Sequence, residues 1–312
     1  MALNRIVALV GGVGGAKLAH GLAQILPPER LTIIVNTGDD FWHYGLRICP
    51  DLDTVMYTLG GLVDPANGWG VAGDTTAALD ALRVYGEEPW FRLGDRDIAT
   101  HLLRTQRLQQ GERLTTIMRE LTGRLRIGPV VLPMTDAEVA TIVHTREYGP
   151  LPFQTYFVKH RWQPAVTAIE FDGAEAAWVS PEAEDALTQA DAILIAPSNP
   201  WLSVAPILAV PGLRELLLRG DRPRVAITPI VGGKALKGPA AKLMAELGYD
   251  VTPDAVCAYY GSAINGFVTD VRDPEPEQPA MRILRTDTVM NSDQDRARLA
   301  AQILAWLERA DL

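Results

Sequence analysis

The chain has 312 residues, 47% of them apolar, and a formal net charge of −9. This length is enough for one large domain or two linked ones. The negative charge does not favour a nucleic-acid partner, whose phosphates need a cationic surface. No stretch approaches the ~20 apolar residues of a membrane span, and Cys49 and Cys257 form no cluster with metal-site spacing. We therefore expect a cytoplasmic protein with free thiols that binds neither nucleic acid nor a membrane.

The amino-terminal part of the chain predicts a strand–helix–strand unit. Residues 5–10 (RIVALV) form a short apolar run typical of a buried strand, and the glycines of GGVGG follow it directly, which argues against a secretory signal. Residues 16–26 have apolar side chains at helical spacing, and residues 31–35 (LTIIV) form a second apolar run. This order is typical of a βαβ unit, so we expect a parallel sheet.

Residues 52–127 predict a mostly helical insertion, because no convincing strand pattern interrupts them. Asp74 and Asp95 stand where they could act as helix N-caps. The expected helices span residues 52–59, 75–85, 96–109 and 115–125.

Strand patterns return after this insertion. Residues 139–145 and 153–158 flank the turn-like sequence EYGPLP and predict a hairpin. The apolar runs at residues 192–196 and 224–228 are similar to the first strand, and we expect a helix after each. The pattern as a whole predicts an α/β fold with a mostly parallel sheet. Further strands are expected at residues 128–133 and 166–171, and a last helix at residues 293–309.

The loops that follow the predicted parallel strands carry the clearest chemistry. In an open parallel sheet, ligands bind outside the carboxyl ends of the strands. Glycine loops that lead into helices offer N–H groups to phosphate, lysines add positive charge, and grouped carboxylates suit a divalent cation that also binds phosphate oxygens. These loops therefore predict a site for a nucleoside diphosphate and a metal ion. The candidate residues are Gly12, Gly14, Gly15, Lys17, Asn36, Asp39, Asp40, Ser198, Asn199, Gly232, Gly233 and Lys234.

Each of these loops also has a simpler explanation. The Gly-x-Gly-x-x-Lys pattern that begins at Gly12 lacks the third glycine of the dinucleotide-binding fingerprint and is not a P-loop, so it could be a tight turn without a ligand. Gly232 and Gly233 could form a surface turn, and Asp39 and Asp40 could lie in a solvated loop. The prediction of a site depends on all the loops meeting at one edge of the sheet.

Asp51 and Asp53 are further acids after the second strand, and either could merely cap the helix that follows them. Other candidates are weaker. His43 and His101 could act as bases, but a lone histidine is more often structural.

Stretches along nearly the whole chain resemble, in order, the motifs of the 2-phospho-L-lactate transferase family of coenzyme F-420 biosynthesis. The longer ones, which include the sequences DLDT and LGDRD, are the most specific. The resemblance implies a Rossmann-like three-layer α/β core at residues 1–51 and 128–312, with a small helical subdomain at residues 52–127 that covers the deazaflavin site. The matching stretches are GGVGGAKLAHGL (11–22), VNTGDDFWHYGLRICPDLDTVMYTLGG (35–61), GWGVAGDT (68–75), RLGDRDIATH (92–101), LPMTD (132–136), APSNPWLSVAPIL (196–208), ITPIVGGKALKGPAAKLM (227–244) and the region around AYYG (258–261).

The resemblance also implies a reaction. A guanosine diphosphate-linked three-carbon acid, 2-phospholactate or phosphoenolpyruvate, passes its phospho-acid portion to the ribityl hydroxyl of the deazaflavin Fo, and GMP leaves with the help of Mg²⁺. The family pattern places Asp53 and Arg92 against the deazaflavin. We expect Mg²⁺ on Asp39, Asp40 or Asp53, and we expect Asp53 and Asp40 to be catalytic, with Asp53 orienting the hydroxyl or accepting its proton. A homodimer is expected from the habit of the family.

Two other functions fit part of the pattern. A regulatory nucleotide-sugar binding protein, as in the related gluconeogenesis-factor family, would keep the glycine loop but does not need the DLDT and LGDRD motifs. A nicotinamide-dependent oxidoreductase is disfavoured by the missing third glycine and by Asn36, which stands where a ribose-binding acid is often found. The sequence is compatible with phospholactate, phosphoenolpyruvate or phosphoglycerate as the transferred acid.

Overall fold

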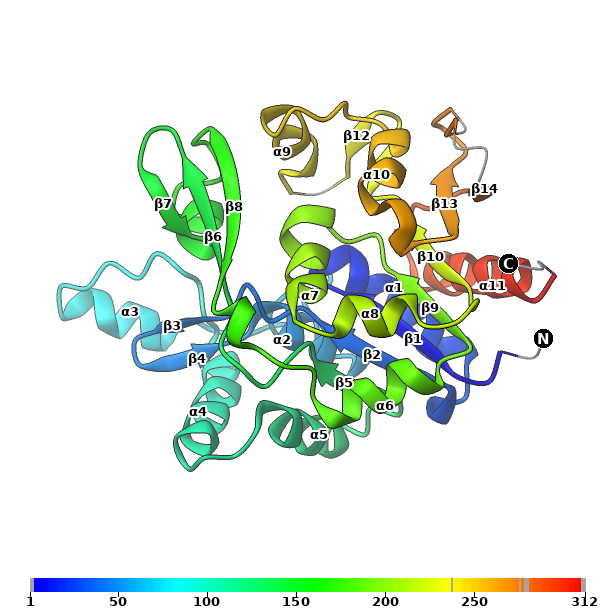
Figure 1. Ribbon diagram of the computed structural model, residues 1–312. Helices are drawn as coiled ribbons and strands as arrows, with labels where there is room; N and C mark the ends of the chain where they lie inside the picture. The colour runs from blue at the N-terminus through cyan, green and yellow to red at the C-terminus, as the bar shows by residue number, and fades with distance from the viewer. Residues whose placement is uncertain (1–2, 237, 275, 278–280, 310–312) are drawn as a thin grey trace.

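The structure is a computed structural model that describes residues 3–236, 238–274, 276–277 and 281–309. The centre of this part of the chain is a seven-stranded sheet in the order β14-β13-β10-β9-β1-β2-β5 (Figure 1). Every neighbouring pair of strands in it is parallel, which confirms the predicted parallel sheet. The strands are β1 (Ile6–Val10), β2 (Leu31–Val35), β5 (Val130–Pro133), β9 (Ala192–Ile195), β10 (Arg224–Ile227), β13 (Gly266–Asp270) and β14 (Arg282–Thr286).

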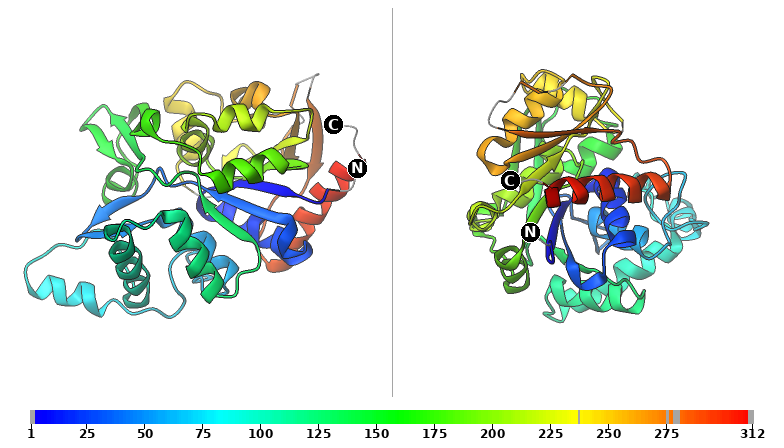
Figure 2. Two further views of the ribbon diagram at one scale, coloured as in Figure 1. Left: turned by 60° about the horizontal axis from the view of Figure 1, so that its bottom comes forward. Right: turned by 90° about the vertical axis from the view of Figure 1, so that its right-hand side faces the viewer.

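Helices cover both faces of this sheet in the expected Rossmann-like, three-layer arrangement (Figure 2). Along β1, Ile6, Ala8 and Val10 pack with the helices of one face, and Val7 and Leu9 pack with those of the other. Because both faces are buried, the strand is apolar at every position. One face carries α1 (Gly12–Ile25), α2 (Pro50–Leu59), α5 (Leu114–Arg124) and α11 (Asp293–Arg309), and the other carries α6 (Pro181–Gln189), α7 (Ala205–Ala209), α8 (Leu213–Leu218) and α10 (Pro253–Tyr260).

The strand order creates a topological switch point between β1 and β9. From β1 the chain first moves outward through β2 to β5, and it then crosses back to β9 on the other side of β1. Ile6 of β1 is aligned with Leu31 of β2 and with Ala192 of β9. The loops after β1 and β9 therefore diverge at the carboxyl edge of the sheet, where open α/β sheets bind their ligands.

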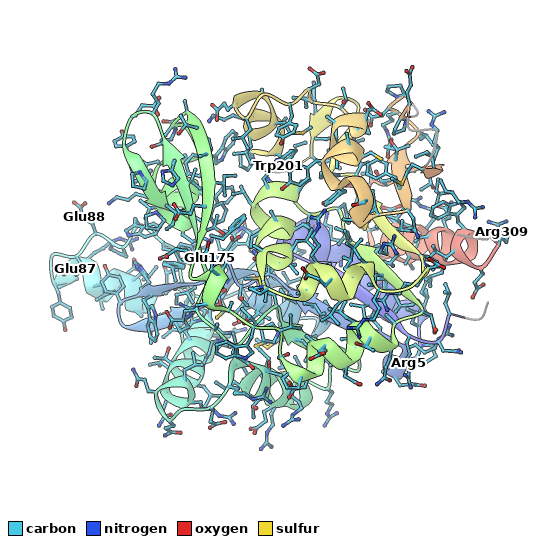
Figure 3. All side chains as sticks on the ribbon, viewed as in Figure 1. Arg5, Glu87, Glu88, Glu175, Trp201 and Arg309 are labelled. Atoms are coloured by element: carbon cyan, nitrogen blue, oxygen red, sulfur yellow. The ribbon has the colours of Figure 1, made fainter. Side chains whose placement is uncertain are left out.

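A β-hairpin and four helices lie between β2 and β5. The helices α2 and α5 pack on the main sheet, whereas α3, α4 and the hairpin surround a small apolar cluster of their own. Figure 3 shows Glu87 and Glu88, which follow α3, at the outer end of this projection. The four predicted helices are confirmed, and a division into domains at residues 51/52 and 127/128 stays a prediction. The projection consists of β3 (Phe41–His43), β4 (Leu46–Ile48), α3 (Ala77–Val84) and α4 (Asp95–Gln109).

Asp74 and Asp95 cap helices as predicted, but Asp74 caps α4 and Asp95 caps α3, so neither caps the helix that directly follows it. The Asp95 carboxylate, at the start of α4, accepts the N–H groups of Ala77 and Ala78 in α3 at 3.0 and 2.9 Å. The Asp74 carboxylate, before α3, accepts the N–H group of Arg96 in α4 at 3.0 Å. This exchange of caps joins the amino ends of the two helices.

A separate antiparallel sheet in the order β7-β6-β8 stands beside the main sheet (Figure 1). The predicted hairpin is confirmed, but the strand predicted at residues 153–158 is wrong, because Thr155–Lys159 form a helical turn. The partner strand comes earlier and contains Pro150 and Pro152, which an edge strand tolerates since its outer N–H groups need no partner. The strands are β6 (Ala140–Thr145), β7 (Gly149–Pro152) and β8 (Val166–Asp172).

Several short strands are not predicted from the sequence. β13 begins with a glycine and β14 carries two arginines at the edge of the sheet, so neither has a continuous apolar run. The segment after β10 also differs from the prediction, because it does not enter a helix directly. It first forms the hairpin β11 (Ile230–Val231) and β12 (Lys234–Ala235), with Gly232 and Gly233 in the turn.

In the described part of the chain, no helix is long and apolar enough to cross a membrane. Cys49 and Cys257 are buried free thiols, as expected.

Candidate active site

A buried serine joins the loops after β1 and β9. The Ser198 hydroxyl donates to the Gly11 carbonyl at 2.7 Å and accepts the Gly11 N–H at 3.0 Å. A Cβ atom on Gly14 would lie 2.5 Å from the Pro197 carbonyl oxygen, and one on Gly15 would lie 2.7 Å from the Ser198 hydroxyl. Glycine at these positions therefore lets α1 approach the β9 loop closely, as the predicted motif requires.

Asp51 and Asn36 meet the amino end of α1. A Cβ atom on Gly11, the N-cap of α1, would lie 2.9 Å from Asp51 Oδ2, and Asn36 Nδ2 donates to Asp51 Oδ2 at 3.0 Å. Asn36 Oδ1 in turn accepts the Gly38 N–H at 2.8 Å, which fixes its orientation. Burial raises the pKa of Asp51 to about 6, although the Asn36 amide and the backbone N–H of Gly12 oppose this change. Loops from β1, β2 and α2 thus converge here, as predicted for the site.

Asp39 and Asp40 are 6% and 3% exposed, so they do not lie in a solvated loop. Asp39 Oδ1 and both carboxylate oxygens of Asp40 have no hydrogen-bond partner among the described residues. Burial and then the charge of Asp51 raise the pKa of Asp39 well above its ordinary value. Burial raises the pKa of Asp40 to about 7, although Arg47, whose Nη2 lies 3.8 Å from Asp40 Oδ2, opposes this. We call Asp39, Asp40 and Asp51 the rim acids.

Asp51 and Asp53 both lie in the first turn of α2 but point in different directions. Two positions along an α-helix correspond to about 200° around its axis. Asp51 therefore reaches the strand ends, whereas Asp53 reaches α4. The N-cap of α2 is Cys49, which makes no side-chain capping bond, so the interpretation of these acids as mere caps is wrong.

Asp53 pairs with Arg104, a fully buried arginine of α4. Arg104 Nη1 donates to Asp53 Oδ2 at 3.0 Å and Nη2 donates to Asp53 Oδ1, so the contact is bidentate. His101 lies between two acids, with Nδ1 3.6 Å from Asp53 Oδ2 and Nε2 3.3 Å from Asp97 Oδ1. Burial alone would lower the pKa of Arg104, but the charge of Asp53 raises it above its ordinary value. We call Asp53, Asp97, His101 and Arg104 the α4 cluster.

The sequence identifies only part of this cluster. His101 is a weak candidate there, and Asp97 and Arg104 are assigned no role. The three side chains follow one another at positions i, i+4 and i+7 of α4, which places them on one face of the helix. This spacing is the signal that could identify them, but charged residues on one helix face are usually solvated, and only packing against α2 and β4 shows that these are buried.

The glycines after β10 already bind a carboxylate of the chain. The N–H groups of Gly232 and Gly233 donate to the two oxygens of Asp273, each at 2.8 Å. Both glycines have positive φ values, of 59° and 69°, which directs their N–H groups to the same side. Asp273 therefore occupies the place predicted for a phosphate, and the side chain of Lys234 beside it is exposed.

The other predicted binding residues are also placed by the structure. Lys17 Nζ donates to the Met290 carbonyl at 2.7 Å, which ties α1 to the segment before α11. Asn199 Oδ1 accepts the N–H groups that begin the turn after β9. Arg92 is exposed in the loop just before α4, on the same projection as the α4 cluster.

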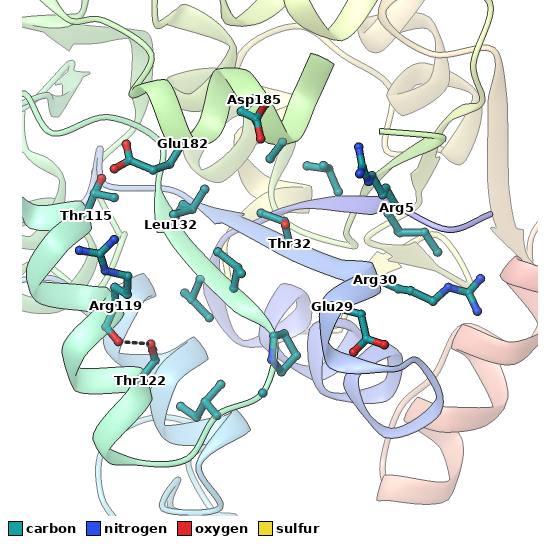
Figure 4. Close-up of a pocket in the computed structure, with 18 of the residues that line it drawn as sticks. Arg5, Glu29, Arg30, Thr32, Thr115, Arg119, Thr122, Leu132, Glu182 and Asp185 are labelled. Atoms are coloured by element: carbon teal, nitrogen blue, oxygen red, sulfur yellow. Dashed lines mark hydrogen bonds between the residues drawn. The ribbon is translucent and has the colours of Figure 1, made fainter. Parts of the chain in front are cut away.

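A cavity of about 480 Å³ lies elsewhere in the molecule. It opens between α5 and α6, near the amino ends of β1, β2 and β5, with Arg5, Thr32 and Arg119 in its wall (Figure 4). This is the opposite edge of the sheet from the rim acids, so the cavity is separate from the candidate active site.

Comparison with known families identifies the chain. Residues 6–307 match the family described as 2-phospho-L-lactate transferase CofD. The chain belongs to this family. A phosphoenolpyruvate transferase of Streptomyces griseus is 41% identical over 313 aligned residues, which cover 97% of this chain and 98% of the relative. A phosphoenolpyruvate transferase of Mycobacterium tuberculosis is 43% identical over 277 residues, which cover 83% and 84%.

Membership of the CofD family confirms the resemblance on which the expected activity depends. This chain is therefore an enzyme, a transferase of phosphorus-containing groups. Among solved structures, a UPF0052-family protein of Bacillus halodurans is similar with a TM-score of 0.63 and 14% identity, covering 97% of this chain and 99% of that protein. At this identity the similarity supports the fold alone.

The acids of this CofD-family enzyme differ in how well they suit a metal ion. Asp39 and Asp40 offer buried carboxylate oxygens without partners, which are the hard ligands that Mg²⁺ prefers. Both oxygens of Asp53 are bound by Arg104, so Asp53 already has a cation as its partner. Asp39 and Asp40 thus fit a magnesium ion better than Asp53, although the Arg47 guanidinium lies 3.8 Å from Asp40 Oδ2.

Proposed function

We propose that this enzyme transfers the phospho-three-carbon-acid portion of a guanosine diphosphate-linked donor to the ribityl hydroxyl of the deazaflavin Fo, with release of GMP, in coenzyme F-420 biosynthesis. The observation that carries this proposal is the pair of buried carboxylates Asp39 and Asp40, with Asp39 beside Asp51 at the amino end of α1 near the switch point. The names of the relatives favour phosphoenolpyruvate as the acid of the donor.

On this proposal, the donor diphosphate lies along the amino end of α1, because its N–H groups and helix dipole attract phosphate. Asp39 and Asp40 hold Mg²⁺, which when bound neutralises charge on the diphosphate oxygens and assists the departure of GMP. The amino end of α1, which lies against Asp51 here, is available to the donor when the Asp51 carboxylate gives way to phosphate. The chain's own contribution is to hold the diphosphate and to exclude water.

The acceptor lies on the side of α4, against Asp53 and Arg92. The Asp53 oxygens keep free lone pairs beside their bonds to Arg104 and can accept a hydrogen bond from the ribityl hydroxyl. The hydroxyl oxygen attacks phosphorus, the bond from phosphorus to GMP breaks, and the hydroxyl proton passes to Asp53 or Asp40. Phe41 of the β3–β4 hairpin packs on Phe91, with 4.9 Å between the ring centroids. Such rings offer an apolar surface for the flat deazaflavin.

The direct test supplies the enzyme with Fo, Mg²⁺ and one guanylated acid at a time, those of lactate, enolpyruvate and glycerate. We expect GMP and one new deazaflavin product, whose mass identifies the transferred acid, with enolpyruvate as the preferred donor. A lack of product with all three donors, from protein that is folded by circular dichroism, would contradict the proposal.

A further inference from the structure

The carboxylate of Asp53 is oriented by the chain itself. Arg104 holds both of its oxygens, and a planar guanidinium that binds both oxygens fixes the plane of the carboxylate as well as its position. The Arg104 side chain is fully buried and Asp53 is 5% exposed, so solvent does not loosen the pair.

Arg104 is itself held in place by neighbouring elements. Its Nη1 also donates to the Arg47 carbonyl of β4 at 3.3 Å, and the Arg47 N–H donates to Thr105 Oγ1 of α4 at 2.7 Å. Two turns toward the amino end of α4, the Tyr57 hydroxyl donates to Asp97 Oδ1 at 2.7 Å. These bonds set the position of α4 relative to both β4 and α2.

A metal ion would be a second way to hold Asp53. Asp53, Asp97 and His101 offer ligand atoms that lie within 4.8 Å of one another. However, Arg104 already supplies a positive charge there, and a metal ion would place a second one beside it in a buried, weakly screened environment. Arg104 and the Tyr57 hydroxyl already bind the Asp53 and Asp97 oxygens that a metal ion would use.

We propose that Arg104 is a positioning residue for the acceptor substrate, because it fixes the Asp53 carboxylate in the orientation that receives the ribityl hydroxyl. This proposal rests on the proposed function, in which Asp53 contacts the deazaflavin. It assigns to α4, an element outside the main sheet, the placement of the group that receives the acceptor. Arg104 itself acts through Asp53 and does not touch the substrate.

The test is a double-mutant cycle on binding of Fo, which is measured by titration of its fluorescence without donor. We expect Arg104→Met and Asp53→Asn each to weaken binding about tenfold. Arg104→Lys keeps the charge but loses the bidentate contact, so it should weaken binding less. Because Arg104 acts through Asp53, the double variant should also bind about tenfold more weakly, and not a hundredfold.

The matched control is Arg107→Met, on the same helix three residues later, where the guanidinium pairs with Glu112 and Glu120 at the surface. It should leave Fo binding within twofold of the wild type. Multiplying effects in the double variant, or equal losses in Arg104→Met and Arg107→Met, would overturn the positioning role.

Two further measurements keep the outcomes distinct. Circular dichroism shows whether Arg104→Met folds. If it does not fold, Fo binding is compared between Arg104→Lys and the double variant. Neither of these two leaves a buried charge of the Asp53–Arg104 pair without its partner. If the wild type does not bind Fo, the proposed function fails together with this inference. If the wild type binds Fo but Arg104→Lys binds it equally well, only the positioning role fails.

Discussion

The rim acids and the α4 cluster both contain buried aspartates, but these aspartates differ in whether a positively charged side chain hydrogen-bonds them. Asp39 and Asp40 are buried with oxygens that lack partners in the described chain, and their pKa values are raised mainly by burial. Asp53, which is equally buried, is bound through both oxygens by Arg104. Burial by itself therefore does not decide the state of a carboxylate here; its partner does.

The comparison shows how one short helix serves both halves of the proposed site. Asp51 and Asp53 are two residues apart on α2, so they face the strand ends and α4 respectively. The side of the rim acids, where no cation hydrogen-bonds Asp39 or Asp40 among the described residues, suits a cation that arrives with the donor. The side with Arg104 suits a neutral hydroxyl, which needs an oriented acceptor of a hydrogen bond and no added charge.

The largest expected difference between the two regions is in stability. Asp53→Ala should lower the free energy of unfolding by about 3–5 kcal/mol, because it leaves Arg104 buried and unpaired. The double variant Asp53→Ala/Arg104→Met should recover much of this loss. Urea unfolding followed by circular dichroism measures both, and Asp80→Ala, at an exposed acid of α3, is the control. A single variant as stable as the wild type would contradict the ion pair.

The contribution of the rim acid Asp40 to the free energy of unfolding should change with pH in the direction opposite to that of an ion-paired acid. The pKa of Asp40 is about 7 in the folded protein and about 3.9 in the unfolded chain. Between these values the folded state binds more protons, so the free energy of unfolding should fall as pH rises.

Removing this carboxylate isolates its contribution. Without divalent cations, Asp40→Asn should gain stability relative to the wild type from pH 4 to pH 8, by on the order of 4 kcal/mol at most. Urea unfolding at several pH values measures the difference. Parallel curves for the variant and the wild type would show that Asp40 is not held in its neutral form.

Stabilisation by magnesium ions should distinguish the rim acids from the α4 cluster, with a smaller effect on stability. Ions that bind only the folded protein should stabilise it by about 2.7 kcal/mol at a concentration one hundred times the dissociation constant. We expect Mg²⁺ to raise the melting temperature of the wild type at pH 8, but not that of Asp39→Asn. Asp97→Asn, in the α4 cluster, should keep the response. A response that depends on Asp97 and not on Asp39 would move the metal site to the α4 cluster.

The smallest expected effect concerns the attachment of α4. Asp74→Ala and Asp95→Ala each remove a helix cap, so each should cost about 1 kcal/mol of stability. Because the two caps join the same pair of helices, the double variant should lose less than the sum. Urea unfolding measures these losses. A loss well above the sum, with weaker Fo binding, would show that the caps also align the α4 cluster.

Much of the fold follows from the order of residues. The apolar run at Ile6–Val10, the glycines after it and the run at Leu31–Val35 predict the βαβ unit, and the structure confirms it. The spacing of apolar residues predicts the helices of the insertion. These features are local, because strand burial and helix periodicity are written in consecutive residues.

Short edge strands and turns are less visible in the sequence. β14 lacks an apolar run because the edge of a sheet tolerates charge. The strand predicted at residues 153–158 is a helical turn, since the preceding Gly149–Pro152 already completes the hairpin.

The sequence by itself determined the family and the candidate site residues: the motifs of a CofD-family transferase, and the glycines and acids after the parallel strands. Only the tertiary structure decided what each can do. The sequence treats Asp39, Asp40 and Asp53 alike, as possible ligands of one ion. Their difference arises because Arg104, far away in sequence, hydrogen-bonds both oxygens of Asp53, whereas the Arg47 guanidinium stays 3.8 Å from Asp40. Partners of a buried charge come from packing between elements, and packing is not a property of consecutive residues.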